Sequence, residues 1–289
     1  MSLYFFRVQR IIPDDFDGLF EFLDLTQISY LAYNGLARPK LDGTTPRLCT
    51  FPELPKWYQD NPHIQTGYRP VSNSYQSCLL SLSYLHNETI NIYTHFLPAL
   101  ILALVLPTLQ IQISRIYHDT TWIDRFMLTL SPMAALFTLT LSTTYHTLMN
   151  HSAFISGSCL LLDYTGILAL ILASFISGIY VGFYNHPFYQ KFYWTMITAL
   201  ITLSCLLVLH PRLQGPRYRP HRTTAFILTA LSGFAPVING VVLYGWYDAY
   251  YYRGVKWWLA EGLWYGIGVA FFATRWPERR GGLSCWLQL

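Results

Sequence analysis

Residues 158–183 read SCLLLDYTGILALILASFISGIYVGF, and Asp163 is the only charged side chain among them. A helix needs about 20 consecutive apolar residues to cross a bilayer, so this stretch predicts a transmembrane helix. An ionisable group inside such a helix is costly unless it is paired, hydrated or bound to a metal. Asp163 therefore marks a candidate functional site, and His146 in the preceding apolar stretch raises the same question.

Further apolar stretches of comparable length predict five more spans. They cover about 93–113, 122–149, 193–211, 223–245 and 256–274. Hydrophobic residues make up 53% of the 289 residues and charged residues only 12%, about half the charged share of a soluble domain. The composition argues against a soluble protein and predicts an all-α fold, a polytopic transmembrane helical bundle. Within it, Pro132 and Pro236 predict helix kinks.

The expected organisation is a polar amino-terminal region, residues 1–85, followed by a transmembrane domain, residues 86–275, and a short carboxy-terminal segment, residues 276–289. The first region holds most of the acids and several prolines, and is expected to have little core of its own.

The distribution of Lys and Arg predicts the orientation. With the amino terminus inside, 14 of these residues lie on internal segments and five on external ones, the bias typical of a cytoplasmic amino terminus. The net charge of +4 is then a topology signal, and no nucleic-acid partner is expected. The five cysteines contain no C-x-x-C pair, which argues against a zinc ribbon or a redox motif.

Polar side chains cluster where the first predicted span begins. Glu88, Asn91 and His95 are spaced i, i+3 and i+7, so on a helix they share one face. That face suits the interior of the bundle or a wet cavity better than lipid. A structural interpretation stays open, in which these residues only begin an interfacial helix, with Glu88 favoured by the helix dipole.

A second group lies across the turn between the second and third spans. Ser142 and His146 are i, i+4 neighbours, and His151 follows about one turn later. His146 and Asp163 lie at similar distances from the centre of the turn, so a helical hairpin places them face to face. Because the first span begins on the same side of the membrane, both groups are expected to converge in the internal leaflet.

Three chemistries can use these groups. A serine hydrolase would use Ser142, His146 and Asp163, but the serine lacks a strained elbow and an evident oxyanion hole. A proton or ion pathway needs acids along the whole bilayer, and the external halves of the spans hold almost none. Metal binding fits better, because neutral histidine is a good zinc ligand and Asp163 can orient a ligand or a water from the second coordination shell.

The ordered set of motifs resembles the progestin and adipoQ receptor family, the seven-span membrane proteins that include the adiponectin receptors and hemolysin III. The residues that carry the resemblance are Glu53-Leu54-Pro55, Trp57, Asp60-Asn61, Gly67-Tyr68-Arg69-Pro70, His86-Asn87-Glu88-Thr89-x-Asn91-x3-His95, Ser142-x3-His146-x4-His151-Ser152, Asp163-Tyr164-x-Gly166 and Pro277-Glu278-Arg279.

The resemblance implies a zinc site. It implies that His146 is a zinc ligand, that Asp163 helps hold the metal or its water, and that two more ligands come from paired histidines opening a seventh span. Residues 280–289 contain no such pair, so the sequence predicts a carboxy-terminally truncated form with six of the seven spans. In that form two of the three zinc ligands are missing, and poor zinc binding is expected.

The function implied by the resemblance is that of a receptor-like integral membrane protein, in the plasma membrane or an endomembrane, with a zinc-dependent role in lipid signalling or lipid metabolism. One alternative is a zinc-dependent, ceramidase-like lipid amide hydrolase, with Asp163 and Ser142 as candidate catalytic residues. Another is an inactive truncated form. Membrane lipids and a lipid, steroid or protein ligand are the expected partners, and no oligomeric state is predicted.

Overall fold

A computed structural model of the chain describes residues 47–280, and the expected truncation therefore lies largely outside the described residues. The α-helices are α4 Tyr75–Leu80, α5 Thr89–Ile116, α6 Trp122–Leu148, α7 Ala153–Gly182, α8 Pro187–Val208, α9 Arg219–Leu231, α10 Phe234–Tyr244, α11 Trp246–Tyr252 and α12 Val255–Thr274. Short 3-10 helices are η2 Phe51–Glu53, η3 Lys56–Tyr58, η4 Ser81–Ser83, η5 Pro211–Leu213, η6 Pro216–Tyr218 and η7 Glu278–Arg280.

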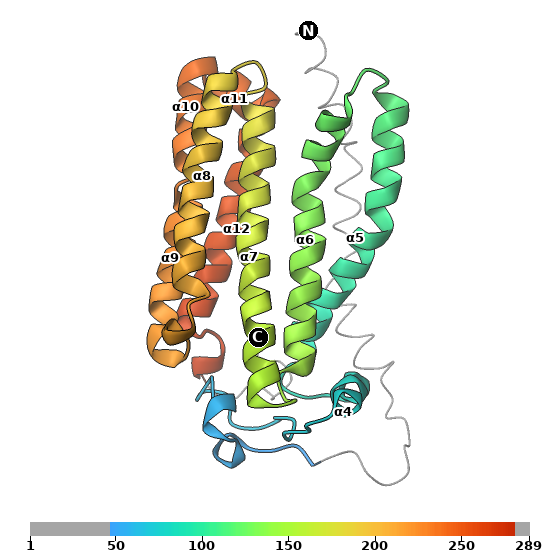
Figure 1. Cartoon of the computed structure of the whole chain (residues 1–289), viewed down its shortest axis with the longest axis vertical. Helices are drawn as coiled ribbons and strands as arrows, with labels where there is room; N and C mark the ends of the chain where they lie inside the picture. Colours follow the sequence, from blue (N-terminus) through green and yellow to red (C-terminus); the bar gives the residue numbers. More distant parts are fainter. Residues whose placement is uncertain (1–46, 281–289) are drawn as a thin grey trace.

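The long helices form an up-and-down bundle (Figure 1). Within residues 47–280, five segments are long and apolar enough to cross a membrane: α5, α6, α7, α8 and the segment Arg219–Tyr244, which contains α9 and α10. This finding confirms the all-α polytopic membrane bundle. The sixth predicted span forms α12, but it is not among these five segments, because Lys256, Glu261 and several tryptophans lower its mean hydropathy.

Helix ends and breaks follow from local sequence. Helix α6 begins with a capping box, in which Thr121 accepts from the backbone N–H of Asp124 and the Asp124 carboxylate accepts from that of Thr121. The predicted kink at Pro236 is confirmed as a break between α9 and α10, because proline has no N–H to donate to the carbonyl four residues earlier. Gly245 and Gly254, both at positive φ, bracket the short helix α11.

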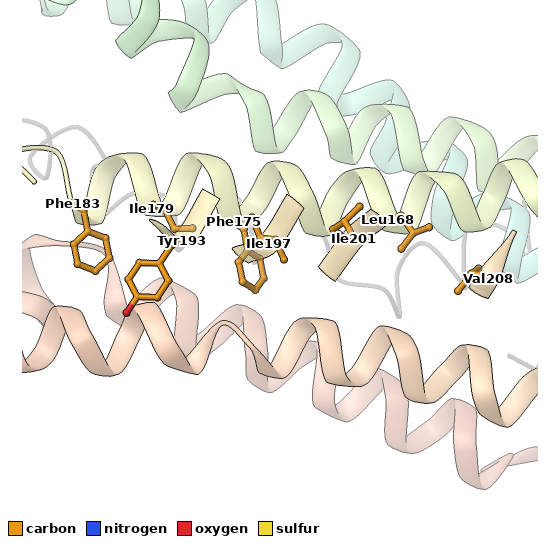
Figure 2. Close-up of a cluster of buried hydrophobic side chains, with 8 residues drawn as sticks. All are labelled: Leu168, Phe175, Ile179, Phe183, Tyr193, Ile197, Ile201 and Val208. Carbon is orange, nitrogen blue, oxygen red and sulfur yellow. The ribbon is translucent and has the colours of Figure 1, made fainter. Parts of the chain in front are cut away.

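A hydrophobic core joins α7 to α8 (Figure 2). Its buried members are Leu168, Phe175, Ile179, Phe183, Tyr193, Ile197, Ile201 and Val208. On the other side of α7, Gly166 lies against α6, where a Cβ would come within 3.1 Å of the Thr138 Cα atom. The Thr138 hydroxyl donates to the Gly166 carbonyl at 2.8 Å. Helix α7 is thus fixed on both sides, which sets the depth of Asp163.

Residues 47–86 fold into a compact unit under the bundle, here called the lead-in cap, and the end of the bundle that it covers is the cap end (Figure 1). Leu54, Tyr58, Ile64 and Tyr68 are buried together with Met149, which follows α6. The expectation that this region has little core of its own is therefore wrong for its described part. The aromatic and aliphatic residues among its prolines bury apolar surface against the end of α6.

Candidate intramembrane polar site

The centre of the polar site is a pair formed by His146 of α6 and Glu88, the residue just before α5. Nδ1 of His146 donates to Oε2 of Glu88 at 2.8 Å. The Glu88 carboxylate, which is 7% exposed, also accepts from the side-chain amides of Asn87 and Asn91 at 2.6 and 2.8 Å. Both oxygens of the Glu88 carboxylate therefore have hydrogen-bond partners.

The turn that leads into α5 holds Glu88 in place. Nδ1 of His86 accepts from the backbone N–H of Glu88 at 3.1 Å, and the backbone N–H of His86 donates to the Thr89 hydroxyl at 2.9 Å. Because Asn91 lies one helical turn after Glu88, its amide reaches back to the same carboxylate. The face-sharing pattern predicted from the sequence is formed.

A second layer of polar groups surrounds the pair. The Ser142 hydroxyl lies 3.2 Å from Nδ1 of His95, and the rings of His95 and His146 stack with centroids 5.7 Å apart. The Asp163 carboxylate of α7 lies within interaction range of Ser142 and His146. The structure thus brings together six of the predicted residues: Glu88, Asn91, His95, Ser142, His146 and Asp163.

Two details of the predicted site differ from the structure. His151 lies outside the cluster: its Nδ1 atom is 3.2 Å from the Ser152 hydroxyl, and its ring is 4.3 Å from that of Tyr75. The turn after α6 directs it toward the lead-in cap. The hydrogen-bond partner of His146 was expected to be Asp163 or water, whereas the structure gives Glu88, which lies directly before α5.

Arg69 of the lead-in cap is part of the same network, although its position in the sequence gives no periodic signal. It is fully buried, and its guanidinium donates to the carbonyls of His146 at 2.6 Å and Thr147 at 2.9 Å and to the Ser81 hydroxyl at 2.8 Å. The last carbonyls of a helix have no partner within it and carry its negative dipole end. Arg69 therefore holds the backbone of His146, while Glu88 holds its ring.

Another acid within a long helix lies apart from this cluster. Glu261 of α12 accepts a 2.7 Å hydrogen bond from the Ser174 hydroxyl of α7. Sequence reasoning that starts from the polar residues around His146 does not single out Glu261, although its position between Ala260 and Gly262 in an apolar stretch is a usable signal.

The described residues form part of a possible zinc site but not the whole of one. Within residues 47–280, no three His, Cys, Asp or Glu side chains stand close enough to hold a metal ion. The surroundings of His146 do fit a single ligand, because metal-bound histidine usually donates its other ring N–H to a carboxylate. Nε2 of His146 has no hydrogen-bond partner among the described residues. This part of the chain fits one zinc ligand and not a complete site.

Comparison with known proteins gives a consistent result. A family model described as haemolysin-III related matches residues 83–288. The chain is 34% identical over 238 residues to the ADIPOR-like receptor IZH2 of Saccharomyces cerevisiae, covering 81% of this chain and 73% of that protein. It is 33% identical over 233 residues to the adiponectin receptor protein of Drosophila melanogaster, covering 81% and 52%. With the progestin and adipoQ receptor-like protein 1 of Caenorhabditis elegans it shares 30% identity over 244 residues, covering 84% and 56%.

Proposed function

The chain belongs to the haemolysin-III-related family of membrane proteins, and from this premise we propose that it is a receptor-like protein with a zinc-dependent role in lipid signalling or lipid metabolism. The observation that carries the proposal is the buried pair of His146 and Glu88, with Asp163 beside it. A charged carboxylate and an imidazole at the membrane boundary are costly to maintain, which supports a binding role. The printed names of several relatives, which include the word receptor, agree with it.

In this proposal His146 contributes Nε2 as one zinc ligand. Glu88 fixes the orientation of the ring through Nδ1, and Arg69 fixes its backbone. Asp163 and Ser142 lie where they can hold a water or a polar ligand group. Residues 47–280 contain no group of three candidate ligands, so the described part of the site supplies one zinc ligand and not a complete set. The amino-terminal region, and with it the lead-in cap, is proposed to lie in the cytoplasm.

The zinc proposal is tested on the full-length protein, purified from membranes and analysed for metal content. The zinc content of the wild type is expected to fall at least tenfold in His146→Ala, because that variant lacks the one zinc ligand that the described residues supply. His151→Ala is the matched control, because it removes an imidazole from the same helix end outside the cluster. Wild-type protein without zinc, or zinc that survives His146→Ala unchanged, would overturn the proposal.

A second candidate, lipid amide hydrolysis of the ceramidase type, is favoured by the position of Asp163 next to Ser142 and His146. Zinc, when bound, would supply Lewis acidity toward the amide carbonyl. Asp163 would accept a proton from the attacking water, and Ser142 would orient it.

Release of fatty acid from ceramides separates the two candidates. The hydrolase predicts release that falls at least 100-fold in Asp163→Asn and in His146→Ala, with His151→Ala close to wild type. A wild type that binds zinc but releases no fatty acid would rule out the hydrolase and support the receptor-like role. A wild type with neither property would favour the inactive form.

A further inference from the structure

Two arginines from distant parts of the chain share one carboxylate at the cap end. Arg219, the first residue of α9, contacts both oxygens of Asp60 through Nη1, at 3.1 and 3.3 Å. Arg275, the residue after α12, contacts Oδ2 of Asp60 through Nη2 at 3.5 Å. The Asp60 side chain is 60% exposed, whereas the arginine side chains are 20% and 24% exposed. The guanidiniums are mostly covered, and the acid between them faces outward.

An aromatic ring holds the two guanidiniums in place independently of Asp60. The Cζ atom of Arg219 lies 4.3 Å from the centre of the Phe272 ring, and that of Arg275 lies 5.9 Å from it. Arginine stacks favourably on aromatic faces and leaves its N–H groups free for an anion. Arg275 also has a left-handed backbone conformation, with φ of 54°, which is uncommon for a residue other than glycine. The two guanidiniums are therefore a preformed cationic pair around one acid.

The surroundings have the character of a membrane boundary. Phe272 and Trp276 are 49% and 44% exposed at the end of α12, and aromatic residues are enriched where helices leave the bilayer. Exposed arginines lie nearby in sequence, at positions Arg212, Arg217, Arg279 and Arg280. Clusters of Lys and Arg directly outside transmembrane helices attract anionic lipids.

We propose that Arg219 and Arg275 form a binding site for the phosphate of an anionic phospholipid, and that Asp60 occupies that site as an internal stand-in. A phosphate offers the same acceptor geometry to paired guanidiniums as a carboxylate, with more oxygens. An exposed ion pair contributes little to stability, so a headgroup concentrated in the adjacent leaflet competes effectively with Asp60. Binding of the lipid releases the lead-in cap at this corner of the bundle.

The test counts the lipids retained by the full-length protein in native mass spectrometry after reconstitution in mixed phosphatidylserine and phosphatidylcholine nanodiscs. Wild type is expected to retain phosphatidylserine in at least threefold excess over its share in the nanodisc. Asp60→Asn is expected to increase this excess by a further factor of three or more, because the competitor is removed. Arg219→Gln combined with Arg275→Gln is expected to abolish it.

The matched control is Arg279→Gln combined with Arg280→Gln, which removes the same charge from exposed neighbours that do not contact Asp60. Equal loss in both double variants would overturn the proposal, because it would mean a diffuse basic surface. Unchanged retention in Asp60→Asn would overturn it as well. Inorganic phosphate that displaces the lipid at millimolar concentration would show a site for free phosphate instead. Arg219→Lys, which keeps the charge and loses the guanidinium fork, is expected to lose most of the excess while it unfolds at the same denaturant concentration as wild type, which excludes misfolding as the cause.

Discussion

The polar site at the cap end and helix α12 are attached to the rest of the molecule in opposite ways. At the cap end, Arg69 and Glu88 hold one helix end through charged, buried hydrogen bonds. Helix α12 instead meets α7 through the Trp258 ring against Gly178 and the bond from Ser174 to Glu261. Most of its other large side chains are exposed, as suits contact with lipid: Trp257, Leu263, Trp264, Tyr265, Phe271 and Phe272. The end of α6 is therefore held by several directional hydrogen bonds, whereas α12 is held against α7 by few contacts.

The largest effect is expected when Arg69 is replaced. Arg69→Met should lower the free energy of unfolding by about 3–5 kcal/mol, because it leaves the buried carbonyls of His146 and Thr147 without their charged donor. Arg47→Met is the control, since the Arg47 side chain is 86% exposed and, among the described residues, forms an ion pair with Glu53 alone; it should cost less than about 1 kcal/mol. Unfolding titrations in detergent micelles measure both. Equal costs would mean that the cap end is not held by its buried charges.

Contact between α7 and α12 gives the next effect. A Cβ on Gly178 would overlap the Trp258 indole, whereas a Cβ on Gly182 would meet no atom within 4 Å. Gly178→Ala should therefore cost about 3 kcal/mol, the upper end for overpacking, and Gly182→Ala should be close to neutral. The same detergent titration reports the difference. If both variants unfold alike, the Trp258 ring does not hold α12 against α7.

The smallest expected effect is the pH dependence of the cap end. Burial, followed by the charge of Arg69, lowers the pKa of His86 from 6.5 to about 3. In this pH range His86 binds a proton in the unfolded chain but not in the folded chain. The free energy of unfolding therefore falls as pH decreases from about 6.5 toward 3. Between pH 7 and pH 5 the loss should be about 2 kcal/mol.

Replacement of His86 should remove most of that slope. Protonation of Nδ1 would eliminate the acceptor for the Glu88 N–H, so His86→Gln should flatten the profile over this range. His63→Gln, an exposed position in the same cap, should leave it unchanged. If the slope persists in His86→Gln, a group other than His86 causes the pH dependence of stability.

Hydrophobic length and helical spacing predicted the parts of the structure that depend on local sequence. The stretches around His146 and Asp163 became α6 and α7, and the i, i+3, i+7 face of Glu88, Asn91 and His95 formed as expected. Lateral packing could not be derived in this way. Whether His146 bonds Glu88 or Asp163 depends on how closely α5 approaches α6, and periodicity within one helix carries no information on that distance.

The role of Arg69 shows a different limit. A single arginine in a loop of Gly, Tyr and Pro gives no spacing signal, and only the fold shows that it meets the end of a helix 77 residues later. The core of the lead-in cap was missed because its apolar residues alternate with prolines and acids and never form a long run. Hydrophobicity averaged over a long stretch does not predict short segments that become stable only when they pack against a neighbour.

The burial of Asn87 and Asn150 has a consequence for experiments on the chain. Both begin N-glycosylation sequons, Asn87-Glu88-Thr89 and Asn150-His151-Ser152, yet they are only 1% and 2% exposed, and the Asn150 amide donates to the Pro70 carbonyl. A sugar on Asn87 or Asn150 would be incompatible with the folded lead-in cap, whichever side of the membrane the cap occupies. Absence of sugar at these positions therefore reports burial and not sidedness. An acceptor sequon engineered next to exposed His118, in the turn between α5 and α6, would report which side of the membrane that turn occupies.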